Sequence, residues 1–219
     1  MTPNSEMLVQ AARNPRFHAL LQKTALNIPD SAGLLWMARC TGQRLPERVA
    51  GVDAVMQLCQ ELTKDCSVFL LGGGEGIGTM AKTRLASRNH RLRVVGVYAG
   101  SPRDEDAAEI LQRINAVKPH FLLVAFGAPQ QDLWIDRHLS AMPSVRVAMG
   151  VGGTLDFLAG VQRRAPSLVQ KIGLEWLWRL VQDPWRIGRI WDAAWVFPWL
   201  VLRYGRAVPP LPSRLSRAR

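Results

Sequence analysis

Between residues 66 and 151, short apolar runs alternate with longer segments of helical patterning. The apolar runs occupy 66–71, 92–99, 120–126 and 145–151, and the helical segments between them occupy 76–89, 104–117 and 129–142. Runs that are apolar throughout, rather than at every second position, are typical of parallel strands covered by helices on both faces. The pattern therefore predicts an α/β fold with a Rossmann-like parallel sheet flanked by helices.

The regions on either side of this core have helical patterns. We expect one amphipathic helix over 5–26, a second within 29–40 and a third over 51–64, all packing against the sheet. Residues 166–206 predict one or two helices broken at Pro184 and Pro198, because proline removes a backbone donor. The chain thus divides into an α/β domain over residues 1–160 and a helical appendage over 161–219.

Four loops follow the predicted strands, at residues 72–76, 98–102, 126–131 and 150–154. Parallel strands end at one edge of the sheet, so these glycine-rich or helix-starting loops converge where ligands bind in such folds. The first loop has neither the lysine of a Walker motif nor the glycine spacing of a dinucleotide fingerprint. Tight turns alone would explain each loop separately, but the four together favour a site for a nucleotide diphosphate.

The appendage is basic and rich in tryptophan. Residues 161–219 hold 11 Lys and Arg against 3 Asp and Glu, so they carry most of the chain's net charge of +11. They also hold six of the eight tryptophans. Such a helix can be a core helix with one solvated side, or it can lie in a membrane interface with arginines reaching lipid phosphates. We favour the membrane surface over nucleic acid, whose basic patches are usually richer in lysine and less apolar.

No apolar run approaches the roughly 20 residues that span a bilayer, and the start of the chain does not look like a secretory signal. We therefore expect a cytoplasmic protein.

Two acidic positions have more than one interpretation. Asp30 follows Pro29 at a predicted helix start, so its carboxylate is either a helix cap or a functional group held ionised by the helix dipole. The acidic run 104–106 resembles a metal-binding Asp-x-Asp. A helix start capped by Ser101 explains it better, so no metal site is expected there.

Several stretches together resemble the WecG/TagA/CpsF glycosyltransferases, glycosyltransferase family 26. They occur in the family's order over nearly the whole chain and include "TPNSEMLVQAARNPRF", "IPDSAGLLWMAR", "ERVAGVDAV", "FGAPQQDLW", "GVGGTLDFLAG", "RRAP" and "GLEWLWRLVQDPWR". The resemblance implies an inverting transfer of a sugar from a UDP-sugar to a polyprenyl-diphosphate-linked saccharide. It also implies that the enzyme is peripheral on the inner face of the bacterial cell membrane. Relatives use N-acetylmannosamine, its uronic acid, glucose or glucuronic acid, and they suggest a homo-oligomer. Neither a cofactor nor a metal is expected.

The resemblance also assigns roles by motif. Asp30 matches the general base, with Thr2 and Asn4 in the adjoining site segment. The donor-binding residues would be those of the glycine loops and of the loop before Asp132, namely Gly72, Gly73, Gly74, Gly76, Gly127, Gln130, Gln131, Gly152 and Gly153. The acceptor diphosphate would meet four arginines, Arg164, Arg179, Arg186 and Arg189.

The sequence also departs from the family pattern. A strand and a helix that usually precede the "TPN" segment are expected to be missing, Ser31 replaces a glycine, and Ile190 and Trp191 replace part of an "R-R-Y" motif. Two other functions stay open. A nucleotide-dependent oxidoreductase would need an acidic residue at the end of the second strand, and a non-enzymatic membrane-binding scaffold would leave Asp30 without a role.

Overall fold

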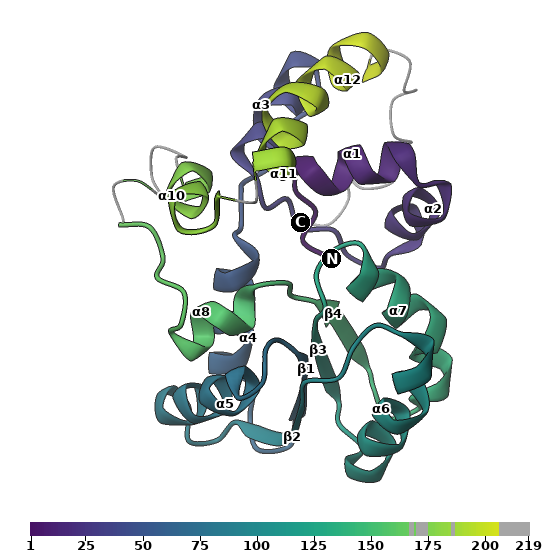
Figure 1. Cartoon of the computed structure of the whole chain (residues 1–219), viewed down its shortest axis with the longest axis vertical. Helices are drawn as coiled ribbons and strands as arrows, with labels where there is room; N and C mark the ends of the chain where they lie inside the picture. Colours follow the sequence, from purple (N-terminus) through teal and green to yellow (C-terminus); the bar gives the residue numbers. More distant parts are fainter. Residues whose placement is uncertain (167–168, 170–174, 185–186, 206–219) are drawn as a thin grey trace, which may run out of the picture.

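A computed structural model describes residues 1–166, 169, 175–184 and 187–205 of the chain (Figure 1). Its centre is a parallel sheet of four strands, β1 (Ser67–Gly72), β2 (Arg93–Tyr98), β3 (Phe121–Ala125) and β4 (Val147–Gly150), in the order β2-β1-β3-β4. The α/β fold with a parallel sheet is thereby confirmed.

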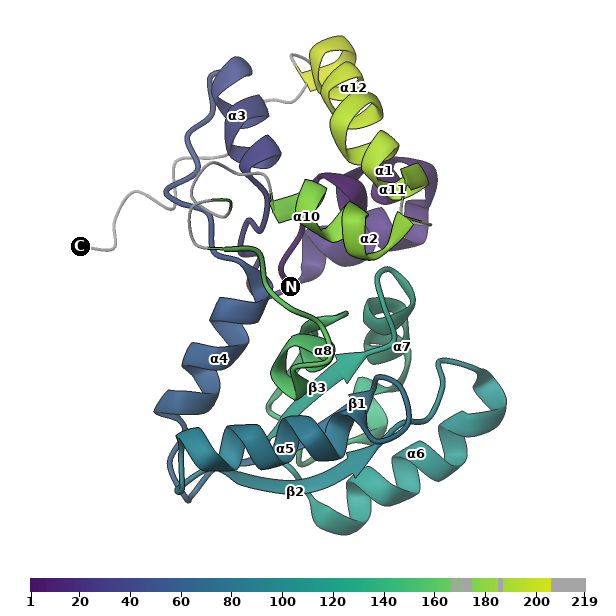
Figure 2. The ribbon, with the colours of Figure 1, turned by 60° about the vertical axis from the view of Figure 1, so that its left-hand side comes forward.

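Helices cover both faces of the sheet (Figures 1 and 2). One face carries α4 (Gly51–Glu61), α5 (Ile77–Arg88) and α8 (Thr154–Ala159), and the other carries α6 (Asp104–Val117) and α7 (Gln130–His138). The bounds of α6 match the predicted 104–117. Two covered faces explain why the strands are apolar throughout.

Strand β1 shows how the two cores share one strand. Val68 and Leu70 belong to the core beneath α4, α5 and α8, whereas Phe69 and Leu71 belong to the core beneath α6 and α7. Successive side chains of a strand point to opposite faces, and here both faces are buried. The sheet is therefore a rigid base that fixes the positions of the loops at its carboxyl edge.

The first three helices form a second tier instead of lying on the sheet. They are α1 (Ser5–Arg13), α2 (Pro15–Lys23) and α3 (Ala32–Cys40). Their buried residues form clusters separate from the two sheet cores, and of the helices before residue 65 only α4 joins a sheet core. The expectation that residues 1–65 pack against the sheet is therefore correct for α4 and wrong for the other three.

The single helix expected over 5–26 is two helices. Asn14 ends α1 and caps α2, because its side-chain oxygen accepts hydrogen bonds from the backbone N–H groups of Arg16 and Phe17 at 3.1 and 3.2 Å. Pro15 occupies the first turn of α2, where its missing N–H costs nothing. The apolar periodicity runs through this corner, which is why the pattern alone suggested one helix.

The C-terminal segment contains α10 (Glu175–Gln182), α11 (Ile187–Trp191), a π-helical turn η3 (Asp192–Val196) and α12 (Phe197–Tyr204). Helix α10 ends before Pro184, as expected. The break expected at Pro198 is wrong, because helical structure runs without interruption from residue 187 to 204. The π-helical turn changes the hydrogen-bond register just before Pro198, which lies in the first turn of α12 and needs no N–H donor there.

These C-terminal helices pack on the N-terminal tier. The Phe197 side chain is only 4% exposed and packs in a cluster with Val9 of α1 and with Leu34 and Met37 of α3. Arg13 forms a two-pronged ion pair with Asp192, with N–O distances of 2.6 and 2.8 Å. Segments far apart in the sequence thus form one helical tier beside the sheet (Figure 2).

Candidate active site

A cavity of about 280 Å³ lies where the ends of β3 and β4 meet the N-terminal segment. Several residues singled out in the sequence line it: Thr2, Asn4, Asp30, Gly127, Gln131, Gly152, Gly153 and Arg189. The structure therefore brings together members of all three predicted groups, catalytic, donor-binding and acceptor-binding.

Asp30 is not a helix cap. The cap of α3 is Ser31, whose hydroxyl accepts a hydrogen bond from the Leu34 N–H at 3.3 Å. The Asp30 backbone N–H donates to the carbonyl of Pro3 at 2.9 Å, which ties it to the segment holding Thr2 and Asn4. Helix capping therefore does not account for the Asp30 carboxylate, which lies in the wall of the cavity.

The Asp30 carboxylate instead lies beside the first residue of α4. A Cβ placed on Gly51 would be 3.3 Å from Asp30 Oδ2 and 3.0 Å from Thr2 Oγ1, so both side chains occupy the space that glycine leaves. The amino end of a helix favours a negative charge. Asp30 and Thr2 are thus neighbours at the positive end of α4.

Asn4 has a structural task in the same wall. It is the N-cap of α1, and its Oδ1 accepts a hydrogen bond from the Met7 N–H at 2.9 Å. Because Oδ1 accepts this bond, Asn4 presents mainly its Nδ2 amino group to a ligand. The cap also fixes the direction in which residues 2–4 cross the cavity.

Gln131 joins the two loops that follow β3 and β4. Its Oε1 accepts hydrogen bonds from the backbone N–H groups of Gly127 at 3.1 Å and Gly152 at 2.9 Å, and the residue is only 4% exposed. A Cβ on Gly150 would lie 2.5 Å from Gln131 Nε2, so a glycine is needed there. Gln131 therefore holds two walls of the cavity at a fixed separation.

The two residues beside Gln131 differ sharply. Gln130 is exposed and does not line the cavity, so its assignment to donor binding stays a prediction. Asp132 is buried, and among the described residues its Oδ2 has no hydrogen-bond partner. Burial raises the pKa of Asp132 to about 6, because the charged form loses its hydration.

The loop after β1 is packed against β3. Gly72 has a φ of +95°, and a Cβ there would lie 2.7 Å from the carbonyl carbon of Ala125, so no other residue fits. The Gly73 N–H donates to the same carbonyl at 3.2 Å. Among the described residues, those of loops 72–76 and 98–102 are absent from the lining of this cavity. Donor binding by Gly72, Gly73, Gly74 and Gly76 stays a prediction.

The predicted arginines have different surroundings. Arg189 lines the cavity, and its Nε lies 2.5 Å from Glu6 Oε1. Arg164 forms an ion pair with Asp53 in the first turn of α4, with Nη2 and Oδ2 3.0 Å apart. Arg186 lies outside the described residues. So does the side chain of Arg179, of which only the place in α10 is described.

Arg48 is a site residue that the sequence analysis did not single out. It lines the cavity, and its Nε donates to the backbone carbonyl of Asp30 at 3.2 Å. It lies between α3 and α4, outside any periodic pattern. The signal that could have found it is its position in the stretch "ERVAGVDAV", which matches the family.

Helix α10 lies beside the cavity and contributes Trp176, Trp178 and Gln182 to its lining. The indole of Trp178 and the amide of Gln182 both donate to the carbonyl of Arg163, each at 3.2 Å. Arg163 itself also lines the cavity, together with Arg48 and Arg189. Three arginines in one cavity suit a ligand that carries phosphates.

In the part of the chain that the structure describes, no three His, Cys, Asp or Glu side chains gather as metal ligands would. The acidic run 104–106 starts α6 and pairs with neighbours: Asp104 with Arg137, and Asp106 with the Ser101 hydroxyl at 2.6 Å. The helix-start interpretation is therefore correct. The cap position, however, is Arg103 and not Ser101, whose hydroxyl instead accepts from the Arg103 N–H.

Comparison with known proteins identifies the family of the chain. The model of the WecG/TagA/CpsF glycosyl transferase family matches residues 1–209. An N-acetylglucosaminyldiphosphoundecaprenol N-acetyl-β-D-mannosaminyltransferase of Bacillus spizizenii is 30% identical over 189 residues, which are 85% of this chain and 72% of the relative. Proteins of the same name from Bacillus subtilis and Staphylococcus aureus are 28% and 29% identical over 190 and 192 residues. These matches cover 86% and 87% of this chain and 73% and 74% of the relatives. The chain therefore belongs to the WecG/TagA/CpsF family of glycosyltransferases.

Proposed function

We propose that this glycosyltransferase moves a sugar from a UDP-sugar to a polyprenyl-diphosphate-linked saccharide, with inversion, in the synthesis of a bacterial cell-surface polysaccharide. The observation that carries the proposal is one cavity that holds the Asp30 carboxylate, three arginines and the glycine loops of β3 and β4. The names of the relatives support N-acetylmannosamine as the sugar and a lipid-linked N-acetylglucosamine as the acceptor.

The proposed reaction is a single displacement. The acceptor hydroxyl attacks the anomeric carbon of the donor, Asp30 takes the hydroxyl proton, and the bond between that carbon and the UDP oxygen breaks. The leaving UDP keeps the bonding electrons. The guanidinium group of Arg163, which lines the same cavity, stabilises its growing negative charge.

This positive potential suggests that transfer needs no metal. Arginines and oriented backbone N–H groups can stabilise a leaving diphosphate in the way that a divalent cation does elsewhere. We expect turnover to continue in EDTA. Loss of turnover in EDTA, restored by Mg²⁺ or Mn²⁺, would contradict this part of the proposal.

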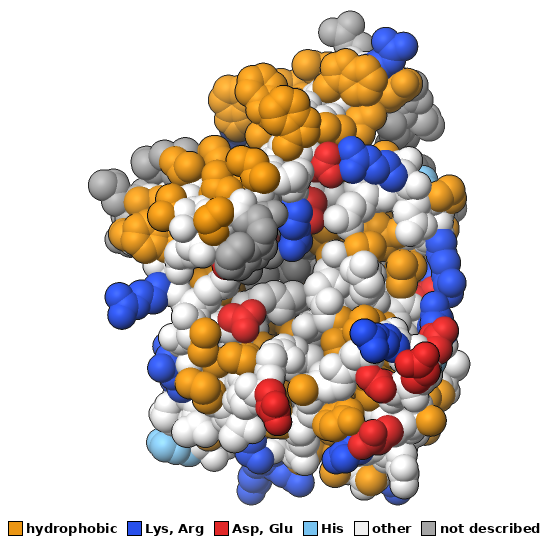
Figure 3. All heavy atoms as spheres, viewed as in Figure 1, with side chains coloured by type: hydrophobic (Ala, Val, Ile, Leu, Met, Phe, Trp, Pro, Cys, Tyr) orange, Lys and Arg blue, Asp and Glu red, His pale blue; other side chains and the backbone are white. Residues whose placement is uncertain are grey.

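Membrane association is the second part of the proposal. Among the described residues, none of the helices is long and apolar enough to cross a bilayer. Large apolar side chains gather instead on the surface of the helical tier (Figure 3), where Trp191, Trp195 and Trp199 are each more than half exposed. Tryptophans of this kind suit a peripheral contact with the inner face of the membrane. A homo-oligomer stays a prediction.

The oxidoreductase alternative lacks its expected residue. Strand β2 ends at Tyr98 and is followed by Ala99, Gly100 and Ser101, so no carboxylate stands there to bind a ribose. A non-enzymatic scaffold would not need Asp30 beside a lined cavity.

The test is UDP release from a panel of UDP-sugars, with and without a lipid-diphosphate-linked N-acetylglucosamine, in wild type and Asp30→Asn. We expect acceptor-dependent release from one donor, and a fall of at least ~100-fold in kcat for the variant with UDP affinity preserved. Asp65→Asn, which alters an exposed aspartate in the turn before β1, is the matched control. Full activity of Asp30→Asn would refute the base, and no release by wild type would refute the transferase.

A further inference from the structure

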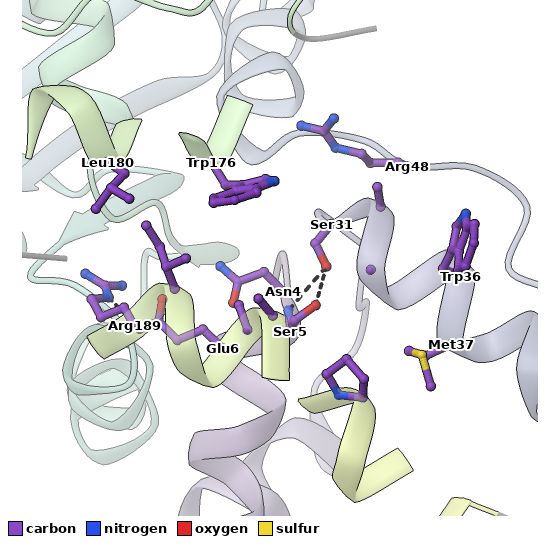
Figure 4. A pocket seen from close by; sticks show the side chains of 16 residues that line it. Asn4, Ser5, Glu6, Ser31, Trp36, Met37, Arg48, Trp176, Leu180 and Arg189 are labelled. Atoms are coloured by element: carbon purple, nitrogen blue, oxygen red, sulfur yellow. Dashed lines mark hydrogen bonds and ion pairs between the residues drawn. The ribbon is translucent and has the colours of Figure 1, made fainter. Parts of the chain in front are cut away.

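A second cavity of about 500 Å³ adjoins the site (Figure 4). It lies between α3 on one side and α10, α11 and η3 on the other. Its apolar lining residues are Ala32, Trp36, Met37, Trp176, Leu180, Ile190, Ala193, Ala194 and Pro198. Its size is that of a pocket for a small organic ligand, roughly 300–1,000 Å³.

The two cavities share part of their lining. Asn4, Arg48, Trp176 and Arg189 line both of them, so the second cavity begins where the acceptor diphosphate would sit in the proposed function. A ligand that reaches from one to the other must pass the guanidinium groups of Arg48 and Arg189.

The polar residues of the second cavity are largely engaged with one another. The hydroxyls of Ser5 and Ser31 lie 2.9 Å apart, Asn4 caps α1, and Glu6 is paired with Arg189. Away from Arg48 and Arg189, what the walls offer a ligand is therefore mainly hydrocarbon. This division makes the cavity amphipathic along its length, with charge at one end and apolar surface at the other.

We propose that this second cavity, the prenyl groove, binds the first isoprene units of the lipid-linked acceptor. The inference rests on the proposed function and adds where the lipid lies. The diphosphate contacts Arg48 and Arg189, and the chain runs along the wall formed by α3, α11 and η3. A polyprenyl diphosphate is charged at one end and is branched hydrocarbon along the rest, which matches the charged end and the apolar walls of the groove.

The outer end of the groove fits a lipid that remains anchored in a bilayer. Trp36 lines the groove and is 70% exposed. Trp195 and Trp199 are exposed on the same tier and lie within three residues of Pro198, which also lines the groove. The rest of the long chain can therefore leave the groove at a surface that already suits the membrane interface. Only the first units need to enter the protein.

The test is a series of soluble acceptors, N-acetylglucosamine diphosphate linked to butyl, geranyl or farnesyl, assayed without membranes. Wild type should use the longer chains better, because each fully buried methylene contributes about a fourfold factor in affinity. We expect kcat/KM to rise at least tenfold from butyl to farnesyl. Ala194→Phe fills the groove from an exposed position, so it should remove most of this rise.

The matched control is Ala86→Phe, the same change at an exposed position of α5 outside both cavities, which should keep the full rise. Equal kcat/KM for all chains in wild type would overturn the groove. A rise that Ala194→Phe preserves would overturn its location. No transfer to any acceptor, by wild type, would refute the proposed function, and the groove with it.

A measurement on the unmutated protein covers the case in which Ala194→Phe does not fold. A geranyl acceptor with a diazirine on its second isoprene unit is irradiated with wild type, and the cross-linked peptides are identified by mass spectrometry. We expect labels on the peptides that contain Trp36 or residues 190–198. Labels confined to helices that do not line the groove would contradict it.

Discussion

Replacing Gln131 by methionine should separate the walls of the cavity. The side chain has a similar length but no acceptor, so the N–H groups of Gly127 and Gly152 lose their shared partner. An unsatisfied buried donor costs about 1–3 kcal/mol. Both glycines line the cavity, where water can partly replace the lost bonds. We therefore expect the free energy of unfolding to fall by about 2–3 kcal/mol.

Urea unfolding measures this loss, and calorimetric titration with UDP measures its consequence. We expect the UDP dissociation constant to rise at least tenfold, because the two loops are no longer held at a fixed separation. Gln130→Met is the matched control: it makes the same change one residue away, at an exposed position, and should shift stability by less than about 0.5 kcal/mol. If Gln131→Met lowers the free energy of unfolding equally little and leaves UDP affinity unchanged, Gln131 does not hold the two loops together.

Three further predictions concern stability and membrane binding. The pKa of Asp132 rises from its ordinary 3.8 to about 6 on folding, so the folded state binds more protons between these values. Stability should therefore fall by roughly 2 kcal/mol as the pH rises from 4 to 6. Asp132→Asn should lack this slope in urea unfolding at each pH. Phe197→Ala should cost about 3–4 kcal/mol and expose residues 187–204 to proteases, whereas Trp199→Ala, at an exposed position, should cost less than 1 kcal/mol. Trp195→Ser should lower the fraction of protein that cosediments with anionic vesicles, and it should leave the free energy of unfolding unchanged. Unchanged sedimentation would count against that contact.

The sheet could be predicted because its signal is local. Each strand is buried on both faces, so each is a continuous apolar run whose limits can be read from its own residues. The helix α6 was equally clear, since three acidic residues mark its positive end. The path of the first 65 residues depended on partners far along the chain, and Asn14 and Pro15 change direction without interrupting the apolar periodicity.

The site was only partly predictable, for the same reason. Asp30, Thr2 and Asn4 were found through resemblance to a family, because no spacing along the chain relates them to Gln131 or Arg189. The contact of Asp30 with the start of α4 depends on Gly51, twenty-one residues later. Arg48 could not be found by pattern, since it acts through its position between two helices. The loop after β1 turns tightly against Ala125 and does not line the cavity, so its part in donor binding stays a prediction.

The packing of Phe197 against α1 and α3 also sets an order of events during synthesis. Met37 leaves the ribosome about 160 residues before Phe197. At roughly 5–20 residues per second, that interval lasts on the order of ten seconds or more. During this time the first helices have no Phe197 to cover their apolar faces, and the cavity lacks the wall that contains Arg189. A nascent chain can therefore form its sheet early, but it gains a complete site only after residues 187–204 have been made.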